Sequence, residues 1–117
     1  MNFEKIVYEC EADLKNRALD ICIKEKNIIT LKFETFEIII YYSAYEYEIG
    51  YHYSANKKHV NLATALKTAG CSENELPPFV MMSDETVMKD YIGAYLTLTD
   101  KYFNELKDTR KILKGKM

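Results

Sequence analysis

The residues with the greatest potential for chemistry form two small groups. Glu46, Glu48 and His52 share one parity in an alternating segment, so one strand face could pair a base with carboxylates. Cys71 could act as a nucleophile only with a base nearby, which His52 or His59 would have to supply. Cys71 also follows a predicted helix C-terminus, whose dipole disfavours a thiolate. A surface His among carboxylates is more commonly part of an ion pair, so neither group predicts a catalytic residue.

No other motif in the chain indicates an enzyme. Four scattered glycines cannot form a phosphate-binding loop, and no paired Cys or His has the spacing of a zinc site. The sequence therefore predicts a non-catalytic protein with no cofactor and no metal site.

Composition limits the partners that the chain could have. The 117 residues fit a single domain spanning 1–117, with 48% hydrophobic and 29% charged residues, ten Tyr and a net charge of −2. No basic block is large enough to follow a phosphate backbone, which disfavours nucleic acid. Purely apolar runs such as Ile38 to Ile40 are too short to cross a bilayer, and the N-terminus lacks the form of a signal peptide. We therefore expect a cytoplasmic protein.

The first 26 residues have a helical pattern. Apolar residues recur at spacings of three and four: Phe3, Val7, Cys10, Leu14, Ala18, Ile21 and Cys22. Asn2 is a suitable N-cap and Asn27 a suitable stop for a helix over 2–26. Such a helix would hold Cys10 and Cys22 about 18 Å apart, too far for a disulfide. With an odd number of cysteines in the chain, we expect all three to be reduced.

The period then changes to two, which predicts three strands over 28–33, 36–42 and 45–53. Turns at Glu34-Thr35 and Ser43-Ala44 are short enough to force an antiparallel meander. Asn61 then caps a short helix over 62–69, and Gly70 follows as its left-handed residue. An acidic loop, 71–78, and a short extended segment, 79–82, precede a last helix over 85–113 that Ser83 or Asp84 caps. The predicted fold is α+β in the order α-β-β-β-α-α, with the helices packed on one face of the sheet.

Alternation along the strands divides the sheet into two faces. We expect the covered face to carry Ile29, Leu31, Phe33, Phe36, Ile38, Ile40, Tyr45, Tyr47 and Ile49, with Tyr51 and Tyr53 escaping burial at the strand end. The open face then carries Thr30, Lys32, Glu37, Ile39, Tyr41, Glu46, Glu48 and His52. It could be an ordinary solvated face, or a contact surface in which large apolar residues stand among charges.

Under the second interpretation, the candidate partner-binding residues are Glu37, Ile39, Tyr41, Glu46, Glu48 and His52. From residue 34 to residue 56 the chain has four acids and no Lys or Arg, so a partner with a basic patch would suit this face. Glu73 and Glu75 in the acidic loop are the second candidate site.

The order of these segments resembles that of small immunity proteins encoded beside polymorphic toxins, mostly in Gram-positive bacteria. The resemblance covers a charged first helix, a Tyr/Glu-rich meander (FEIIIYYSAYEYEIGYHYS), a helix after an Asn cap (VNLATALKTAG) and a last helix with its approach (FVMMSDETVMKDYIGAYLTLTDKYF). It implies a cytoplasmic protein that binds a cognate toxin domain and blocks its active site or its fold.

Two other functions fit the same sequence. The chain could inhibit or regulate another host or phage enzyme through the same kind of contact. It could also be a small-molecule-binding domain or an enzyme, with a Tyr/Glu-lined pocket between the sheet and the last helix. An enclosed cavity with Tyr hydroxyls would favour the ligand, and a flat open face would favour the protein partner.

Overall fold

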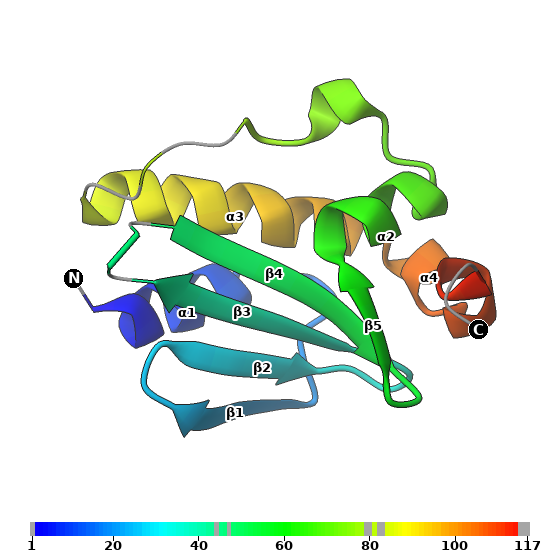
Figure 1. Cartoon of the computed structure of the whole chain (residues 1–117), viewed down its shortest axis with the longest axis horizontal. Helices are drawn as coiled ribbons and strands as arrows, with labels where there is room; N and C mark the ends of the chain where they lie inside the picture. Colours follow the sequence, from blue (N-terminus) through cyan, green and yellow to red (C-terminus); the bar gives the residue numbers. More distant parts are fainter. Residues whose placement is uncertain (1, 44, 47, 79–80, 82–83, 115–117) are drawn as a thin grey trace.

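The computed structural model of the chain describes residues 2–43, 45–46, 48–78, 81 and 84–114, apart from the side chain of Lys24. It has an α+β fold in which one antiparallel sheet has the strand order β1-β2-β3-β4-β5 (Figure 1). The strands are β1 (Asp20–Glu25), β2 (Ile28–Lys32), β3 (Glu37–Ser43), β4 (Glu48–Ala55) and β5 (Lys58–Asn61). The helices are α1 (Phe3–Ala12), α2 (Leu62–Ala69), the 3-10 turn η1 (Glu73–Glu75), α3 (Glu85–Lys101), α4 (Phe103–Leu106) and α5 (Thr109–Ile112).

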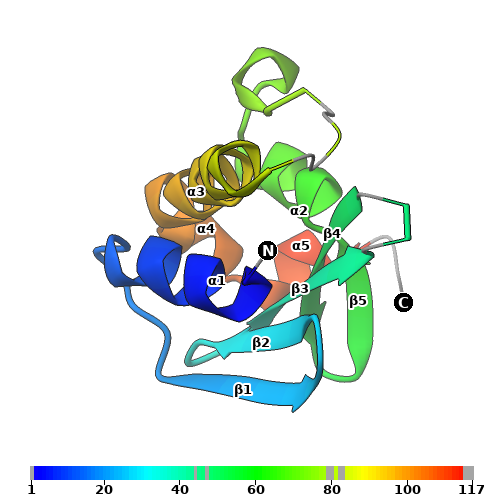
Figure 2. The ribbon, with the colours of Figure 1, turned by 90° about the vertical axis from the view of Figure 1, so that its left-hand side faces the viewer.

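The α+β class, the antiparallel meander and the single covered face are confirmed. Figure 2 shows α1, α3 and the other helices gathered on one side of the curved sheet. The predicted number of strands is wrong, because β1 and β5 add one strand to each side of the predicted three. The predicted order of elements is wrong for the same reason.

The first helix is shorter than its pattern predicted. Asn2 does cap it, with its Oδ1 accepting a hydrogen bond from the Lys5 backbone N–H at 3.0 Å, but α1 ends at Ala12. The later part of the predicted helix forms β1 instead, paired with β2. β-Branched Ile21 and Ile23 alternate there, and such residues fit a pleated strand better than a helix. Asn27, the predicted stop, has a φ of 68° in the β1–β2 turn.

The sheet places the three cysteines on separate elements. Cys10 lies in α1, Cys22 in β1 and Cys71 after α2, and all three are free thiols. The predicted separation of Cys10 and Cys22 assumed that both lie on one helix. That assumption was wrong, because the two residues belong to different elements.

The third predicted strand begins later and is buried further than expected. β4 starts at Glu48, so Tyr45 lies in the β3–β4 turn and is 95% exposed, which contradicts its assignment to the covered face. Tyr47 lies outside the described residues. Tyr51 and Tyr53 are buried, although we expected them to escape burial. The helical layer extends over this end of the sheet, and the Tyr53 hydroxyl donates a hydrogen bond to the Leu106 carbonyl oxygen at 2.6 Å.

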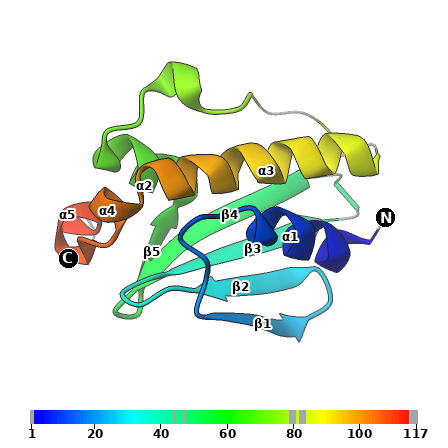
Figure 3. The ribbon, with the colours of Figure 1, turned by 180° about the vertical axis from the view of Figure 1, so that it is seen from behind.

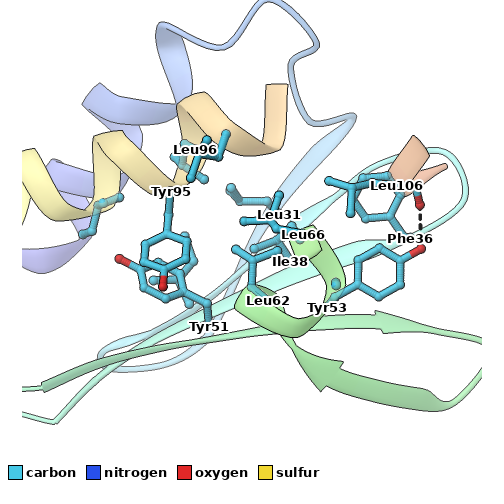
Figure 4. Packing of buried hydrophobic residues seen from close by; sticks show 14 of the residues in the cluster. Leu31, Phe36, Ile38, Tyr51, Tyr53, Leu62, Leu66, Tyr95, Leu96 and Leu106 are labelled. Carbon is cyan, nitrogen blue, oxygen red and sulfur yellow. Dashed lines mark hydrogen bonds between the residues drawn. The ribbon is translucent and has the colours of Figure 1, made fainter. Parts of the chain in front are cut away.

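The other residues assigned to the covered face are all buried: Ile29, Leu31, Phe33, Phe36, Ile38, Ile40 and Ile49. They meet apolar residues of the helices in one core, as Figure 4 shows for Leu31 and Ile38 beside Leu66 and Leu96. Seen from behind, α1 and α3 cross the covered face of the sheet (Figure 3).

Both predicted ends of α2 and the predicted start of α3 are confirmed. Asn61 caps α2 by accepting a hydrogen bond from the Ala63 N–H at 2.8 Å, and Gly70 takes the left-handed conformation with a φ of 115°. Asp84 caps α3. Ser83 lies outside the described residues, as does most of the predicted extended segment 79–82.

The last predicted helix is broken into three. α3 ends at Lys101, after which the chain turns at Tyr102 and again at Asp108, which caps α5. These turns bring Leu106 and Ile112 back into the core, where both are buried. One straight helix could not cover the end of the sheet, so burial of these residues outweighs the continuous helical pattern. Among the described residues, no helix is long and apolar enough to cross a membrane.

Candidate functional site

The open face of the sheet is built from side chains that the strand register places in rows. Ile39 of β3 lies between Thr30 of β2 and His52 of β4, and Tyr41 lies between Ile28 and Gly50. These residues point away from the helices because their neighbours along each strand point into the core. The register thus confirms that Ile39, Tyr41 and His52 share the open face.

Tyr41 lies flat against the sheet, over Gly50 of the neighbouring strand β4. A Cβ atom added to Gly50 would lie 2.0 Å from Cζ of Tyr41, so the ring rests directly on the backbone of β4. The ring also stacks on His52, with a centroid distance of 5.4 Å and an interplanar angle of 19°. Tyr41 is nonetheless 38% exposed, which leaves aromatic surface available to a partner.

A second histidine extends this group across the next strand. His59 of β5 meets His52 edge to face, with a centroid distance of 5.6 Å. From the sequence, His59 was considered only as a possible base for Cys71, because no strand was predicted over 58–61. We call Tyr41, His52 and His59 the aromatic row. The only signal for it was the pairing of β4 with β5, which local periodicity does not reveal.

The surroundings of His52 in the aromatic row favour its neutral form. Burial lowers the pKa of His52, and the neighbouring His59 lowers it further, because two imidazolium ions would repel each other. Nδ1 of His52 is buried and has no hydrogen-bond partner among the described residues. At neutral pH His52 is therefore uncharged, and its Nδ1 remains an unsatisfied polar atom within the aromatic row.

The expected grouping of Glu46, Glu48 and His52 is not formed. Glu46 lies in the β3–β4 turn, where its N–H donates to Oγ of Ser43 at 3.3 Å, and Glu48 is the first residue of β4. Glu48 and His52 are four residues apart on one strand, or about 13 Å. The ring of Tyr41 rests on Gly50 between them. The structure therefore separates the acids from the histidine, and the pairing of a base with a carboxylate has no geometric support.

The acids of the open face fall into two groups. The register puts Lys32 of β2 between Glu37 and Asp20. This end of the face therefore has a basic residue beside Glu37, which the count of charges from residue 34 to residue 56 did not include. Glu46 and Glu48 are exposed and form no ion pair with any described side chain. The unmatched negative charge therefore gathers at the β3–β4 end, next to Tyr41.

The second candidate site, the loop after α2, has internal partners for both of its acids. Glu75 is held by Lys101, by the Tyr102 hydroxyl at 2.6 Å and by the Ser72 N–H at 2.9 Å. These hydrogen bonds, that of Lys101 foremost, lower the pKa of Glu75 to about 2. Glu73 pairs with Lys67 at 3.3 Å. The two acids thus fasten the loop to α2 and to the end of α3.

The remaining candidates for chemistry have little support. The Cys71 thiol is buried, and burial followed by the nearby Glu75 raises its pKa, which opposes thiolate formation. Between the sheet and α3, the rings of Tyr51 and Tyr95 stack at 4.3 Å, so packed aromatic rings occupy that region (Figure 4). No group of three or more His, Cys, Asp or Glu in the described part of the chain could hold a metal ion.

Comparison with known proteins gives no match: no family model, no curated protein and no solved structure is significantly similar to this chain.

Proposed function

We propose that this chain binds a protein partner with a basic patch through the open face of its sheet. The observation that carries the proposal is the aromatic row of Tyr41, His52 and His59 on a face that no described helix covers. Aromatic side chains held rigidly at a surface dominate the energy of many interfaces, because little conformational entropy is lost when they are buried.

The charges beside the aromatic row indicate the chemistry of the partner. Glu46 and Glu48 stand at the end of the face nearest Tyr41, without an ion-pair partner among the described side chains. A partner that brings Lys or Arg to this edge would supply the missing charge and gain in association rate. The predicted contacts are therefore an aromatic centre and an acidic rim, with Glu37 a weaker contributor because Lys32 already lies beside it.

The role that best joins this surface to the resemblance seen in the sequence is that of an immunity protein. We infer that the chain binds a cognate bacterial toxin domain in the cytoplasm and neutralises it. A small-molecule site between the sheet and α3 is less well supported, because the stacked rings of Tyr51 and Tyr95 occupy that region.

The binding test begins with capture of the partner from the source cells, followed by kinetics with purified proteins. Tyr41→Ala should speed dissociation, corresponding to a loss of about 2 kcal/mol or more. The double change Glu46→Lys and Glu48→Lys should slow association and weaken its dependence on salt. Tyr8→Ala is the matched control, since Tyr8 is similarly exposed, at 44%, but lies on α1 across the sheet.

The neutralisation test uses growth as its readout. Cells that express the captured partner should grow only when they also express this chain, and Tyr41→Ala should reduce that protection. A partner whose binding rates are unchanged by all of these substitutions would rule out the open face. A partner that is not toxic, yet binds through this face, would rule out the immunity role alone.

A further inference from the structure

The outer edge of β1 is an unpaired edge of the sheet among the described residues. β1 pairs with β2 on one side and with no described strand on the other, and it lies at the margin of the sheet beyond the helical layer (Figure 2). The opposite edge differs, because β5 has only four residues and runs directly into α2. An unpaired strand edge presents free N–H and C=O groups that a further strand can satisfy.

An exposed apolar side chain marks the same edge. Ile23 is the register partner of Ile29, which is fully buried, so Ile23 points to the helix side of the sheet. It is nevertheless 42% exposed, because the helices end before they reach β1. Ile21 shares this side and is only partly buried against the core. The covered face of the sheet thus ends in apolar surface that one more strand would protect.

We propose that β1 pairs in antiparallel fashion with β1 of a second copy of this chain, with Cys22 at the two-fold axis. In this alignment Ile21 of one copy lies opposite Ile23 of the other, on the helix side of both sheets. Four isoleucines then form one apolar cluster across the axis, and the two sheets become continuous. This proposal does not depend on the proposed function.

The charges of the strand favour a second copy over an unrelated strand. In the sequence Asp20 and Lys24 stand two residues before and two residues after Cys22, so this alignment sets an acidic position of one copy against a basic position of the other at each margin of the regular segment. Opposite charges attract there without requiring a particular side-chain geometry. Moving the centre to the bond between Cys22 and Ile23 would instead place Asp20 against Glu25, which is unfavourable. The strand is therefore complementary to itself in one register and repels itself in the adjacent one.

The contact is expected to be short and reversible. The pairing of β1 with β2 shifts register between Ile23 and Glu25, and a bulge of this kind interrupts regular pairing. Only the segment around Cys22 is then available as a regular edge. We therefore expect a dimer that dissociates on dilution.

Cys22 provides a direct test of the register. Residues directly opposite each other in an antiparallel pair have Cα atoms about 4.5–5.5 Å apart, which suits a disulfide. Cys10 and Cys71 are buried, whereas Cys22 is partly exposed. Treatment of the full chain with diamide, which takes the two thiol hydrogens and is reduced to its hydrazine, should yield a disulfide-linked dimer. Cys22→Ser should abolish it.

A charge exchange separates the proposed pairing from random collision. Asp20→Lys should reduce both the rate of cross-linking and the dimer fraction measured by light scattering without oxidant. The double change Asp20→Lys with Lys24→Asp should restore both. Ile23→Lys should leave a monomer, and circular dichroism would confirm that this exposed position does not affect folding. A monomer at every concentration, or cross-linking that is indifferent to the charge exchange, would overturn the proposal.

Discussion

The ring of Tyr41 in β3 fills the space that a side chain at Gly50 in β4 would need. Because position 50 has no side chain, the ring of Tyr41 lies where a Cβ atom would stand, 2.0 Å from its Cζ atom. A side chain at position 50 would have to lift the ring away from the sheet and from His52. The flat aromatic row therefore depends on a glycine that contributes no contact surface of its own.

Gly50→Ala tests this dependence without removing the ring. The tyrosine can move because it is the mobile end of a side chain, so the fold should survive while the stacking on His52 is lost. NMR should show a change in the ring-current shifts of the His52 ring protons comparable with that caused by Tyr41→Ala. Unchanged chemical shifts of His52 in Gly50→Ala would contradict the position of the Tyr41 ring over Gly50. In partner binding, the two substitutions should be less than additive, because both remove the same anchor.

Ile38 and Ile39 are adjacent in β3 and provide a matched pair for the two faces. Ile38 is fully buried under the helices, so Ile38→Ala should reduce the free energy of unfolding by about 2–5 kcal/mol. Leu98→Ala, which truncates a buried residue of α3, should fall in the same range. Ile39→Ala should cost clearly less, since Ile39 is only partly buried on the open face. Urea unfolding measures all three, and equal losses at positions 38 and 39 would mean that both faces are covered.

Two buried tyrosines of β4 should respond differently to loss of their hydroxyls. The Tyr53 hydroxyl donates to the Leu106 carbonyl oxygen at 2.6 Å, so Tyr53→Phe leaves that carbonyl unpaired and should cost about 1–3 kcal/mol. The Tyr51 hydroxyl has no hydrogen-bond partner among the described residues, so Tyr51→Phe should not destabilise the protein. Thermal and urea unfolding of the two variants provide the comparison. A larger loss for Tyr51→Phe would contradict this assignment of the hydroxyl groups.

His52 should make the protein less stable in mild acid. Its pKa in the folded state is lowered, by burial first and by His59 second, below the ordinary value of 6.5. As pH falls through about 6.5 the unfolded chain takes up the proton before the folded chain does, so stability decreases. Urea unfolding between pH about 7.5 and about 5 should show this decrease. His52→Phe keeps an aromatic ring but removes the titration, and should flatten that pH dependence. If the free energy of unfolding of His52→Phe depends on pH as strongly as that of the original protein, other groups cause the dependence.

Glu75 should confer stability that is lost at lower pH. Its pKa is lowered to about 2, chiefly by Lys101 and then by Tyr102 and the Ser72 N–H, so its contribution is complete above about 4.5. It declines as pH falls from that value towards 2. Glu75→Gln should therefore lower the melting temperature at pH about 6 and make it less sensitive to acidification. Glu73→Gln is the control, because that carboxylate is well exposed and has one lysine contact. Equal effects of the two changes would mean that Glu75 does not anchor the loop.

Much of the local structure could be predicted from the sequence, because it depends on interactions between residues that are close in the chain. The alternation from Phe36 to Tyr42 predicts the central strand and its buried face, because successive side chains of a strand point in opposite directions whatever lies around them. The caps at Asn2, Asn61, Gly70 and Asp84 follow from hydrogen bonds or backbone angles within one turn of helix. These signals need no knowledge of the rest of the fold.

The tertiary structure decided where the elements end and which residues meet. In the sequence, residues 20–25 have both a helical spacing with the preceding residues and an alternation of their own, and pairing with β2 makes them a strand. The last helix breaks at Tyr102 and Asp108, and these turns bring Leu106 and Ile112 into the core. Periodicity predicts which face a side chain occupies, but not what covers that face, so Tyr51 and Tyr53 were misjudged.

The candidate site shows the same division most clearly. Sequence alone placed Ile39, Tyr41 and His52 on one face, because each alternates with the apolar residues that were assigned to the covered face in its own strand. The stacking of Tyr41 on His52, the arrival of His59 and the position of Lys32 beside Glu37 all depend on the register between strands. Register is fixed by turns and by the buried face as a whole, so residues distant in the chain become neighbours only when the sheet is assembled.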